Sequence, residues 1–377
     1  MTERDDLANE GLALLRELLG QGFDVHTLQT GTIQPAVIPP SDDEADLIIN
    51  VHDRQGGMAS RVLVEAKTDL SPAHARNVLA PKVRLMQQLT GDAAVLVIAP
   101  WLSPRTRQEL EQRHYGYLDL TGNVSFRLTR PLVVIRTEGA RHDPAPQRPA
   151  GRPQLGGSKA GRLVRFLADY RPPYRALDIT KATGLSQPYV SRLLDALENE
   201  ALIARERRTI IEVDWAGIIR ARAEQLDLLG SSDAVAMLAP QGLHRVLDAL
   251  SQNIEPYQEK PGPLAVTGPY ATAEVAPTAS GGQLMLYVEH DAVSPVRREL
   301  GLLGPASGGA DVLLLRSPDP VVFERRRTVG GLPHVALSQL AIDSLAGPGR
   351  MPAEGEAVLQ YMADHEKDWR MSFARAG

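Results

Sequence analysis

The stretch VLVEAKTD at residues 62–69 is an apolar run that admits an acid and a base two positions apart, Glu65 and Lys67. In a β-strand, side chains two positions apart lie on the same face, so these two groups are expected to stand side by side. A carboxylate can bind Mg²⁺, and the bound metal lowers the pKa of a coordinated water. A neighbouring lysine can orient that water or neutralise charge that develops on a phosphate. The pair therefore predicts phosphodiester chemistry.

A second carboxylate, Asp46, begins the preceding apolar run, DLIINVHD. If residues 46–53 and 61–67 pair as a hairpin through the Gly-rich turn RQGG, Asp46 lies directly opposite Glu65. Directly paired residues have Cβ atoms about 4.5–5.5 Å apart, which is close enough for two carboxylates to share one metal ion. The spacing predicts Asp46 and Glu65 as metal ligands and Lys67 as a catalytic residue. The alternative is a pair of charges at the exposed end of a strand with no chemical role.

The elements around these residues alternate helical and strand patterns over residues 1–138. Apolar residues at helical spacing predict a helix over 5–19, and a further helix is expected over about 71–90. The run AAVLVIA predicts a buried strand over 93–99. We therefore expect an α/β domain in which a mixed sheet is flanked by helices.

This order of helix, strand pair, helix and strand resembles the PD-(D/E)XK nuclease fold over residues 5–135, and the EAK of VLVEAKTD matches its short motif. The resemblance implies that Asp46 and Glu65 hold Mg²⁺ and that Lys67 acts in catalysis. The alternative within the same fold is a scaffold without turnover that contacts DNA or a partner protein.

Residues 139–160 are rich in Pro, Gly and Arg and show no periodicity, which predicts a linker. The next segment, 161–225, contains two short helical patterns separated by Gly184, where a helix-turn-helix needs a residue that tolerates positive φ. Ser186 is placed to cap the second helix, expected over 187–198. The apolar residues expected to face inward are Leu177, Ile179 and Ala182 in the first helix and Val190, Leu193, Leu194 and Leu197 in the second.

The outward face of the second helix is where a recognition helix meets base edges and phosphates. A hairpin follows in ALIARERRTIIEVD, and its arginines form a basic wing. Between residues 141 and 175 there are eight Lys or Arg against two Asp, so positive charge is local although the whole chain carries −5. The predicted DNA-binding residues are Ser186, Gln187, Tyr189, Ser191 and Arg192 of the helix and Arg205, Arg207 and Arg208 of the wing.

This segment resembles winged helix-turn-helix regulators of the MarR and IclR kind. The resemblance implies double-stranded DNA as the partner and a homodimer as the working form. The alternative is a winged helix used only for protein contacts, as in an assembly adaptor.

Residues 226–377 bring the strand patterns GPLAVTG, QLMLYVE and ADVLLLRS, followed by a helix from Ser338. Their order, with GLPHVALSQLAIDSL and a Gly-Arg-led helix, resembles AbiEi-kind antitoxins over about 160–365. Such proteins join a winged helix to a nucleotidyltransferase-like domain and repress their own operon, so the resemblance implies that fold and a cognate toxin as partner. The only acids near QLMLYVE, Glu289 and Asp291, lie past the strand, which favours a non-catalytic binding or dimerisation module. A generic α/β ligand-sensing domain is the alternative.

The composition limits the remaining possibilities. The 377 residues include no cysteine, which excludes disulfides and thiolate metal sites. The N-terminal residues lack a signal-peptide pattern, and no apolar run approaches the roughly 18 residues of a membrane span, so we expect a cytoplasmic protein without membrane contact. No phosphate-binding GxxxxGK[ST] motif is present.

These observations predict a multidomain α/β protein with a nuclease-like mixed sheet, a winged helix-turn-helix and a C-terminal nucleotidyltransferase-like α/β domain. The predicted function is that of a sequence-specific DNA-binding transcriptional regulator of antitoxin-like type. The alternative is a Mg²⁺-dependent DNA endonuclease that the winged helix directs to its target.

Overall fold

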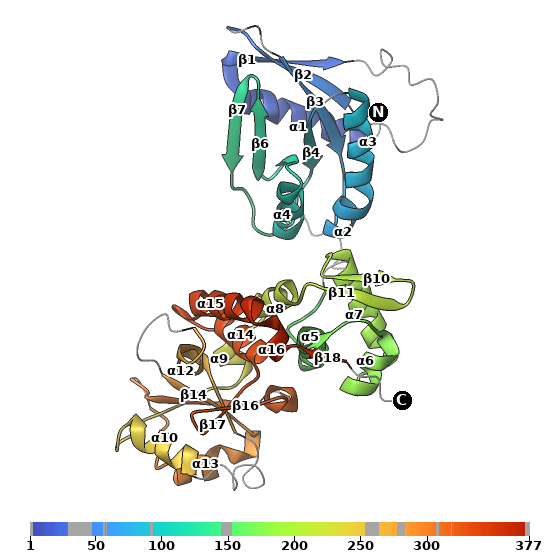
Figure 1. Cartoon of the computed structure of the whole chain (residues 1–377). Helices are drawn as coiled ribbons and strands as arrows, with labels where there is room; N and C mark the ends of the chain where they lie inside the picture. The colour runs from blue at the N-terminus through green and yellow to red at the C-terminus, as the bar shows by residue number, and fades with distance from the viewer. Residues whose placement is uncertain are drawn as a thin grey trace. The chain divides into compact units, whose positions relative to one another are not determined.

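The computed structural model describes residues 3–28, 47–55, 57, 59–90, 93–144, 153–252, 264–276, 283–306, 309–317 and 319–373. The chain divides into two compact units, Met1–Arg152 with Glu198–Ala201, and Pro153–Leu197 with Leu202–Gly377 (Figure 1). Both units combine a mixed β-sheet with helices, so the predicted multidomain α/β architecture is confirmed. No helix in the described parts of the chain is long and apolar enough to cross a membrane.

The first unit is built on a sheet that, in its described residues, has seven strands in sequential order. β3 pairs in parallel with β4, and β4 in parallel with β5, while the other neighbours are antiparallel. The strands are β1 Phe23–Leu28, β2 Leu47–Asp53, β3 Ala59–Ala66, β4 Ala94–Ala99, β5 Gly116–Asp119, β6 Val124–Thr129 and β7 Leu132–Thr137. The helices are α1 Glu3–Leu19, α2 Pro72–His74, a π-helical turn Ala75–Leu79, α3 Ala80–Thr90 and α4 Pro104–Gln112, with a 3-10 turn at Gly20–Gly22.

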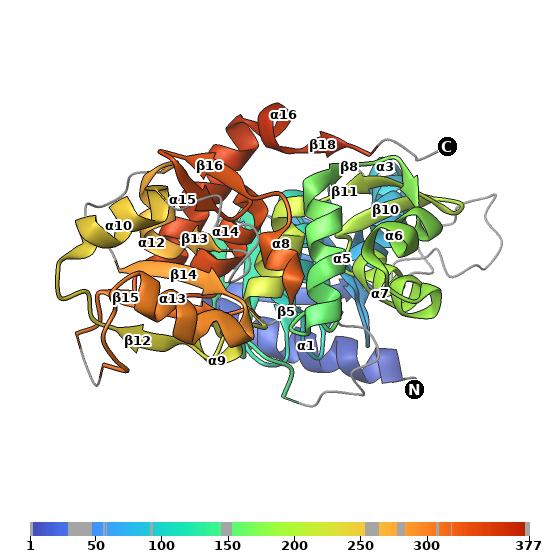
Figure 2. The ribbon, with the colours of Figure 1, turned by 90° about the horizontal axis from the view of Figure 1, so that it is seen from below.

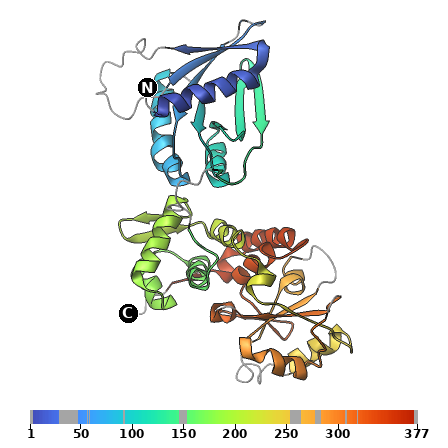
Figure 3. The same ribbon diagram turned by 180° about the vertical axis from the view of Figure 1, so that it is seen from behind.

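The side chains of β4 point alternately to the two faces of this sheet, and helices cover both faces. Leu96 and Ile98 point into a core shared with α1, which crosses one face (Figure 3). Val95 and Val97 point into a second core formed with the segment that leads into α3 and with α4. A strand buried on both faces must be apolar throughout, as AVLVIA is.

The register of the β2–β3 hairpin was predicted from the sequence and is confirmed for residues 47–52. Leu47 lies opposite Val64, and the pairing continues without a bulge to His52 opposite Ala59. Asp46 lies outside the described residues.

The second unit opens with the helix-turn-helix segment. Its helices are α5 Ser158–Asp169, α6 Ala176–Thr183, α7 Gln187–Asn199 and α8 Trp215–Ala223. The wing is a three-stranded sheet in the order β10-β11-β9, with β9 Tyr174–Arg175, β10 Ile203–Glu206 and β11 Thr209–Val213. A short strand β8, Tyr170–Arg171, pairs in parallel with β18, Met371–Ser372, near the end of the described chain.

The rest of the second unit surrounds a sheet whose described strands run in the order β12-β15-β14-β13-β17-β16. These strands are β12 Val235–Met237, β13 Ala265–Thr267, β14 Leu284–Val288, β15 Val312–Arg316, β16 Arg327–Val329 and β17 Leu332–His334. The helices are α9 Leu228–Ser231, α10 Leu243–Gln252, α12 Gly268–Ala273, α13 Val293–Glu299, α14 Leu337–Leu345, α15 Met351–Asp364 and α16 Glu366–Trp369, with 3-10 turns at His290–Ala292 and Pro320–Phe323.

One apolar core runs through the whole second unit, from Leu155 to Trp369. α8 lies beside α5 (Figure 2). It carries Trp215, whose ring meets that of Trp369 edge-on at 5.1 Å between centroids. The domain boundary expected at 225/226 therefore falls inside a compact unit. The expected linker also contributes to this unit, because Leu155 is fully buried although it lies in a segment rich in Pro and Gly.

Candidate nucleic-acid interface

The turn between α6 and α7 has the geometry that the sequence predicts. Gly184 ends α6 with φ +67°, and its amide donates to the Thr180 carbonyl at 3.0 Å. A side chain at that φ would be strained, which explains the glycine. Ser186 precedes α7, and its carbonyl accepts from the Val190 amide at 3.0 Å. α7 begins at Gln187, the residue predicted from the sequence.

The inward face of α7 is buried as predicted, whereas that of α6 is only partly so. The buried residues of α7 are Val190, Leu193, Leu194 and Leu197. In α6, Ile179 is buried, but Leu177 is 50% exposed and Ala182 is exposed, so the expected shared face was wrong. Residues two apart on a helix do not lie on one face, which is why Leu177 cannot accompany Ile179 into the core.

The predicted DNA-contacting residues of α7 differ in their exposure. Gln187 and Arg192 are exposed, and Ser191 is half-buried. Tyr189 is also half-buried and packs against the core, and this burial raises the pKa of its hydroxyl. Tyr189 thus remains a neutral hydrogen-bonding group at the edge of the face, while Gln187 and Arg192 project from it.

The wing ends in a two-residue turn, because Glu206 and Thr209 are paired across the hairpin. The turn residues Arg207 and Arg208 are exposed, and Arg207 has φ +57°, in the left-handed region. Hairpin turns usually place Gly or Asn in that conformation, because other L-residues are strained there. Arg207 therefore adopts a strained backbone conformation at a position where its guanidinium is exposed to solvent.

Arg205 has a different environment from the other two wing arginines. Its Nη2 lies 2.7 Å from Oδ1 of Asp195 on α7, and the Arg205 side chain is 24% exposed. This ion pair joins the wing to the recognition helix. Arg205 therefore positions β10 against α7, in addition to supplying positive charge.

Much of the positive charge counted over residues 141–175 is used inside the protein. Arg165 is 1% exposed and pairs with Asp169, its Nη2 lying 3.0 Å from Oδ2. Arg162 pairs with Asp319 at 2.8 Å, and Arg171 donates to the Arg370 carbonyl. The basic patch is therefore smaller than the count indicated, since a guanidinium can stabilise the fold through internal hydrogen bonds and ion pairs instead of binding a phosphate. Arg148 and Arg152 lie outside the described residues, and Arg141, Lys159 and Arg175 are exposed.

The structure brings Glu65 and Lys67 together, as predicted, and adds a second lysine. Glu65 is 1% exposed, and its Oε2 lies 3.1 Å from the Lys67 ammonium. Its Oε1 lies 3.0 Å from the ammonium of Lys82, which α3 supplies. Sequence reasoning missed Lys82, although its position three residues after the buried Leu79 indicates a side chain that turns toward the sheet.

This cluster bears on the predicted metal site. Both oxygens of Glu65 accept from ammonium groups, and such ion pairs compete with metal coordination. Within the described residues, no group of three or more His, Asp or Glu side chains could hold a metal ion. One carboxylate beside two ammonium groups has a net positive charge, which suits a phosphate oxygen better than a cation. Asp46, the other predicted ligand, is not among the described residues.

A buried acid that the sequence reasoning did not single out lies in the second unit. Asp343 of α14 accepts hydrogen bonds from Thr267 at 2.6 Å, Gln339 at 2.8 Å and Tyr287 at 3.0 Å. Burial raises its pKa to about 6, and these hydrogen bonds partly offset that rise. Glu289 and Asp291, the only acids near β14 in the sequence, are exposed.

Comparison with known families agrees with this geometry. Residues 158–207 match the model of the IclR helix-turn-helix domain, a span that runs from the start of α5 through α6 and α7 to Arg207 at the wing tip. No curated protein and no solved structure matches the chain significantly. The predicted winged helix-turn-helix is therefore confirmed, and this chain carries a DNA-binding helix-turn-helix domain of the IclR type.

Proposed function

We propose that this protein is a transcriptional regulator that reads a specific double-stranded DNA sequence with α7 and contacts the backbone with its wing. The observation that carries the proposal is the two-sided character of α7. Four apolar residues fix one side of the helix in the core, while Arg192 projects from the other side and Gln187 is exposed as the first residue of the helix. A helix held in this way can enter a major groove with its N-terminal half.

The exposed groups fall into two chemical roles. Arg192 and Gln187 can make paired hydrogen bonds to base edges, Arg to guanine and Gln to adenine, and so discriminate sequence. Arg207 and Arg208 at the wing tip can pair with phosphates, which contributes affinity without discrimination.

The experiment is a selection of binding sites from random-sequence duplexes, followed by fluorescence anisotropy with the full chain. Arg192→Ala should weaken binding to the selected sequence by about 5- to 150-fold, the loss of one paired base contact, and should weaken binding to random DNA much less. Arg298→Ala, which removes an exposed arginine from α13, is the matched control and should bind like the wild type. A full chain that binds no DNA at low salt would exclude the proposal and would favour a protein-contact role for the winged helix.

We further propose that the protein binds as a homodimer, which is the common arrangement for paired recognition helices. The selected sequence should then contain two related half-sites about 10 base pairs apart or a multiple of that spacing. Light scattering of the complex should give two chains for each duplex. A single unrepeated half-site bound by one chain would contradict this part of the proposal.

The resemblance of residues 160–365 to AbiEi-kind antitoxins extends the proposal to autorepression with a cognate toxin as partner. Footprinting on the promoter of its own operon is the appropriate test. Protection of that promoter, strengthened by the co-expressed toxin, is expected under the antitoxin-like reading. Binding only at other promoters would reject autorepression and would indicate a regulator of other genes.

A second candidate function is that of a Mg²⁺-dependent DNA endonuclease. It is supported by the confirmed register of β2 and β3 and by the Glu65–Lys67 pair. Supercoiled plasmid with Mg²⁺ or Mn²⁺ should be nicked, and Asp46→Ala, Glu65→Ala and Lys67→Ala should each abolish the nicking. If a metal must compete with the ammonium of Lys82 for Glu65, Lys82→Ala should lower the metal concentration required. Absence of nicking by the wild type would leave the first unit as a non-catalytic scaffold.

A further inference from the structure

A cavity of about 420 Å³ lies in the second unit, where the end of α5 meets the chain that leads into β16 and the helices α15 and α16. Three consecutive arginines, Arg325, Arg326 and Arg327, line it, and Tyr361 and Trp369 give it an aromatic side. Its volume falls within the roughly 300–1,000 Å³ of small-molecule sites. Three arginines among its lining residues favour negative charge in the cavity.

Arg327 is the least satisfied of these three side chains. Its Nε donates to the Val335 carbonyl at 3.1 Å, but its Nη2 is buried and has no hydrogen-bond partner among the residues that the structure describes. A buried donor without a partner costs free energy, and a guanidinium cannot escape that cost by losing its proton. Arg326 lies beside it in sequence and donates to the Leu264 carbonyl through Nη1. Nη2 of Arg327 is closed to the cavity, but burial also lowers the pKa of the Arg327 guanidinium, so an oxyanion in the cavity would stabilise this partly desolvated charge.

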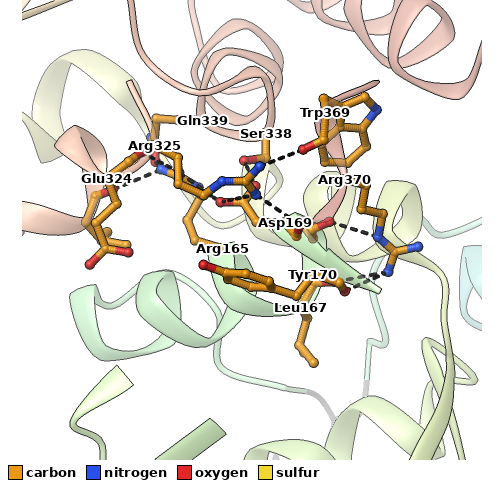
Figure 4. Close-up of polar contacts among 12 residues, drawn as sticks. Arg165, Leu167, Asp169, Tyr170, Glu324, Arg325, Ser338, Gln339, Trp369 and Arg370 are labelled. Carbon is orange, nitrogen blue, oxygen red and sulfur yellow. Dashed lines mark hydrogen bonds and ion pairs between the residues drawn. The ribbon is translucent and has the colours of Figure 1, made fainter. Parts of the chain in front are cut away.

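Arg325 connects the cavity to the helix-turn-helix segment (Figure 4). It donates to the carbonyls of Asp169 at 2.9 Å and Trp369 at 2.6 Å, and its guanidinium lies 5.4 Å from the ring centre of Tyr170. Its backbone has φ +56°, a strained conformation for an arginine. Strain of this kind persists where surrounding contacts enforce it, and it is frequent at ligand sites.

The two acids of the cavity offset only part of this positive charge, although Oδ2 of Asp169 lies 3.6 Å from Nη1 of Arg325. Asp169 pairs with Arg165, whose Nη2 lies 3.0 Å from Oδ2, and it also accepts from the Ser338 hydroxyl (Figure 4). Asp368 is exposed to solvent at the edge. One carboxylate is thus shared between Arg325 and a fourth arginine, and the other is screened by water, so neither acid pairs with Arg326 or Arg327.

We infer that this cavity binds a small organic anion whose carboxylate or phosphate group pairs with Arg326 and Arg327 and whose body lies against Tyr361 and Trp369. Planar guanidinium groups match both kinds of oxyanion through paired hydrogen bonds. The aromatic side favours a ligand with an apolar or ring-shaped body over an inorganic ion alone.

The same ligand should influence DNA binding, a consequence that rests on the proposed function. Asp169 is the last residue of α5, the first helix of the matched helix-turn-helix span. An anion held by Arg326 and Arg327 also attracts the adjacent guanidinium of Arg325, which weakens its ion pair with Asp169 and so loosens the attachment of α5. The affinity for DNA should fall by about 5-fold or more, and by reciprocity bound DNA should lower the affinity for the anion by the same factor.

Binding is tested on the full chain without DNA, by titration with inorganic phosphate and with benzoate at constant ionic strength. Trp369 lines the cavity, so fluorescence of a chain with Trp101→Phe and Trp215→Phe reports occupancy. A saturable change is expected with at least one probe, and the stronger probe identifies the phosphate or the carboxylate class. Arg327→Met and Arg326→Gln should each weaken that binding by about 10-fold or more, whereas Arg298→Gln should not change it.

No saturable change with either probe, or unchanged affinity in both cavity variants, would overturn the inference. The use of two variants protects the test, since a misfolded Arg327→Met would still leave Arg326→Gln. Anion binding without any DNA binding would preserve the cavity site and reject the proposed function. DNA binding that no bound anion alters would reject the coupling to α5.

Discussion

Replacing Arg207 by glycine separates the stability of the wing from its contribution to DNA binding. Arg207 occupies the turn between the paired residues Glu206 and Thr209, with φ +57° and an exposed side chain. The left-handed conformation costs an L-residue about 1–2 kcal/mol, whereas glycine adopts it freely. Glycine loses about 0.5–1 kcal/mol more conformational entropy on folding. The free energy of unfolding of Arg207→Gly should therefore be unchanged or up to about 1.5 kcal/mol higher.

The same substitution should weaken DNA binding in a way that salt reveals. If Arg207 neutralises one phosphate, its loss reduces the slope of log K against log salt by about 0.9. The ratio of wild-type to variant affinity then changes by a factor of about eight for each tenfold change in salt. Anisotropy titrations at several salt concentrations give the slope, and urea unfolding gives the stability.

Two further substitutions at this position act as controls. Arg207→Lys keeps a positive charge and should keep the salt slope. Arg207→Asn tolerates the left-handed backbone without a charge, so its slope should match that of glycine. A glycine variant that binds with the wild-type slope would refute contact between the wing tip and phosphate. A loss of stability in that variant would refute the argument from backbone strain.

Three further predictions concern the folded state. Burial raises the pKa of Asp343 to about 6, so the native state should lose up to about 3 kcal/mol of stability as the pH rises from about 4 to 6. In urea unfolding, Asp343→Asn should gain stability relative to wild type over that window. Burial lowers the pKa of His334 to about 4, so the native state should lose stability as the pH falls from about 6.5 to 4, and His334→Gln should remove that loss. A difference in unfolding free energy between variant and wild type that does not vary with pH would contradict the assignment for Asp343 or for His334. In Gly11→Ala the added Cβ would lie 2.8 Å from Cδ1 of Ile98, so the free energy of unfolding of the first unit should fall by about 1–3 kcal/mol. DNA binding by the second unit should stay unchanged, and weaker DNA binding would show that the units are not independent.

Local patterns in the sequence were sufficient for several elements. The hydrophobic period of α7 gave its buried face, and Gly184 gave the turn before it. The β2–β3 register followed from two apolar runs and a Gly-rich turn between them. In each case the partners are near one another in the chain, so the pattern that specifies them lies within one short window.

Contacts between distant segments could not be predicted in this way. Lys82 reaches Glu65 only because α3 packs on the sheet, and Arg165 is buried only because α14 closes over α5. A period shows which face of a helix is apolar, but it does not show what covers that face. The charged residues of α5 consequently suggested a DNA contact when part of their role is to join two halves of one unit.

The buried arginine of α5 has a consequence for how this protein could be divided or recombined. Arg165 donates to the carbonyls of Val321 and Glu324 and to the side chain of Gln339, all of which come after α8 in the chain. A fragment that ended at Ala223 would leave the guanidinium without these acceptors and the ring of Trp215 without that of Trp369. The DNA reader is therefore not a transferable module. An exchange of parts between related proteins would preserve folding if it cut the chain near residue 152, and would expose a charged, half-built core if it cut near 225.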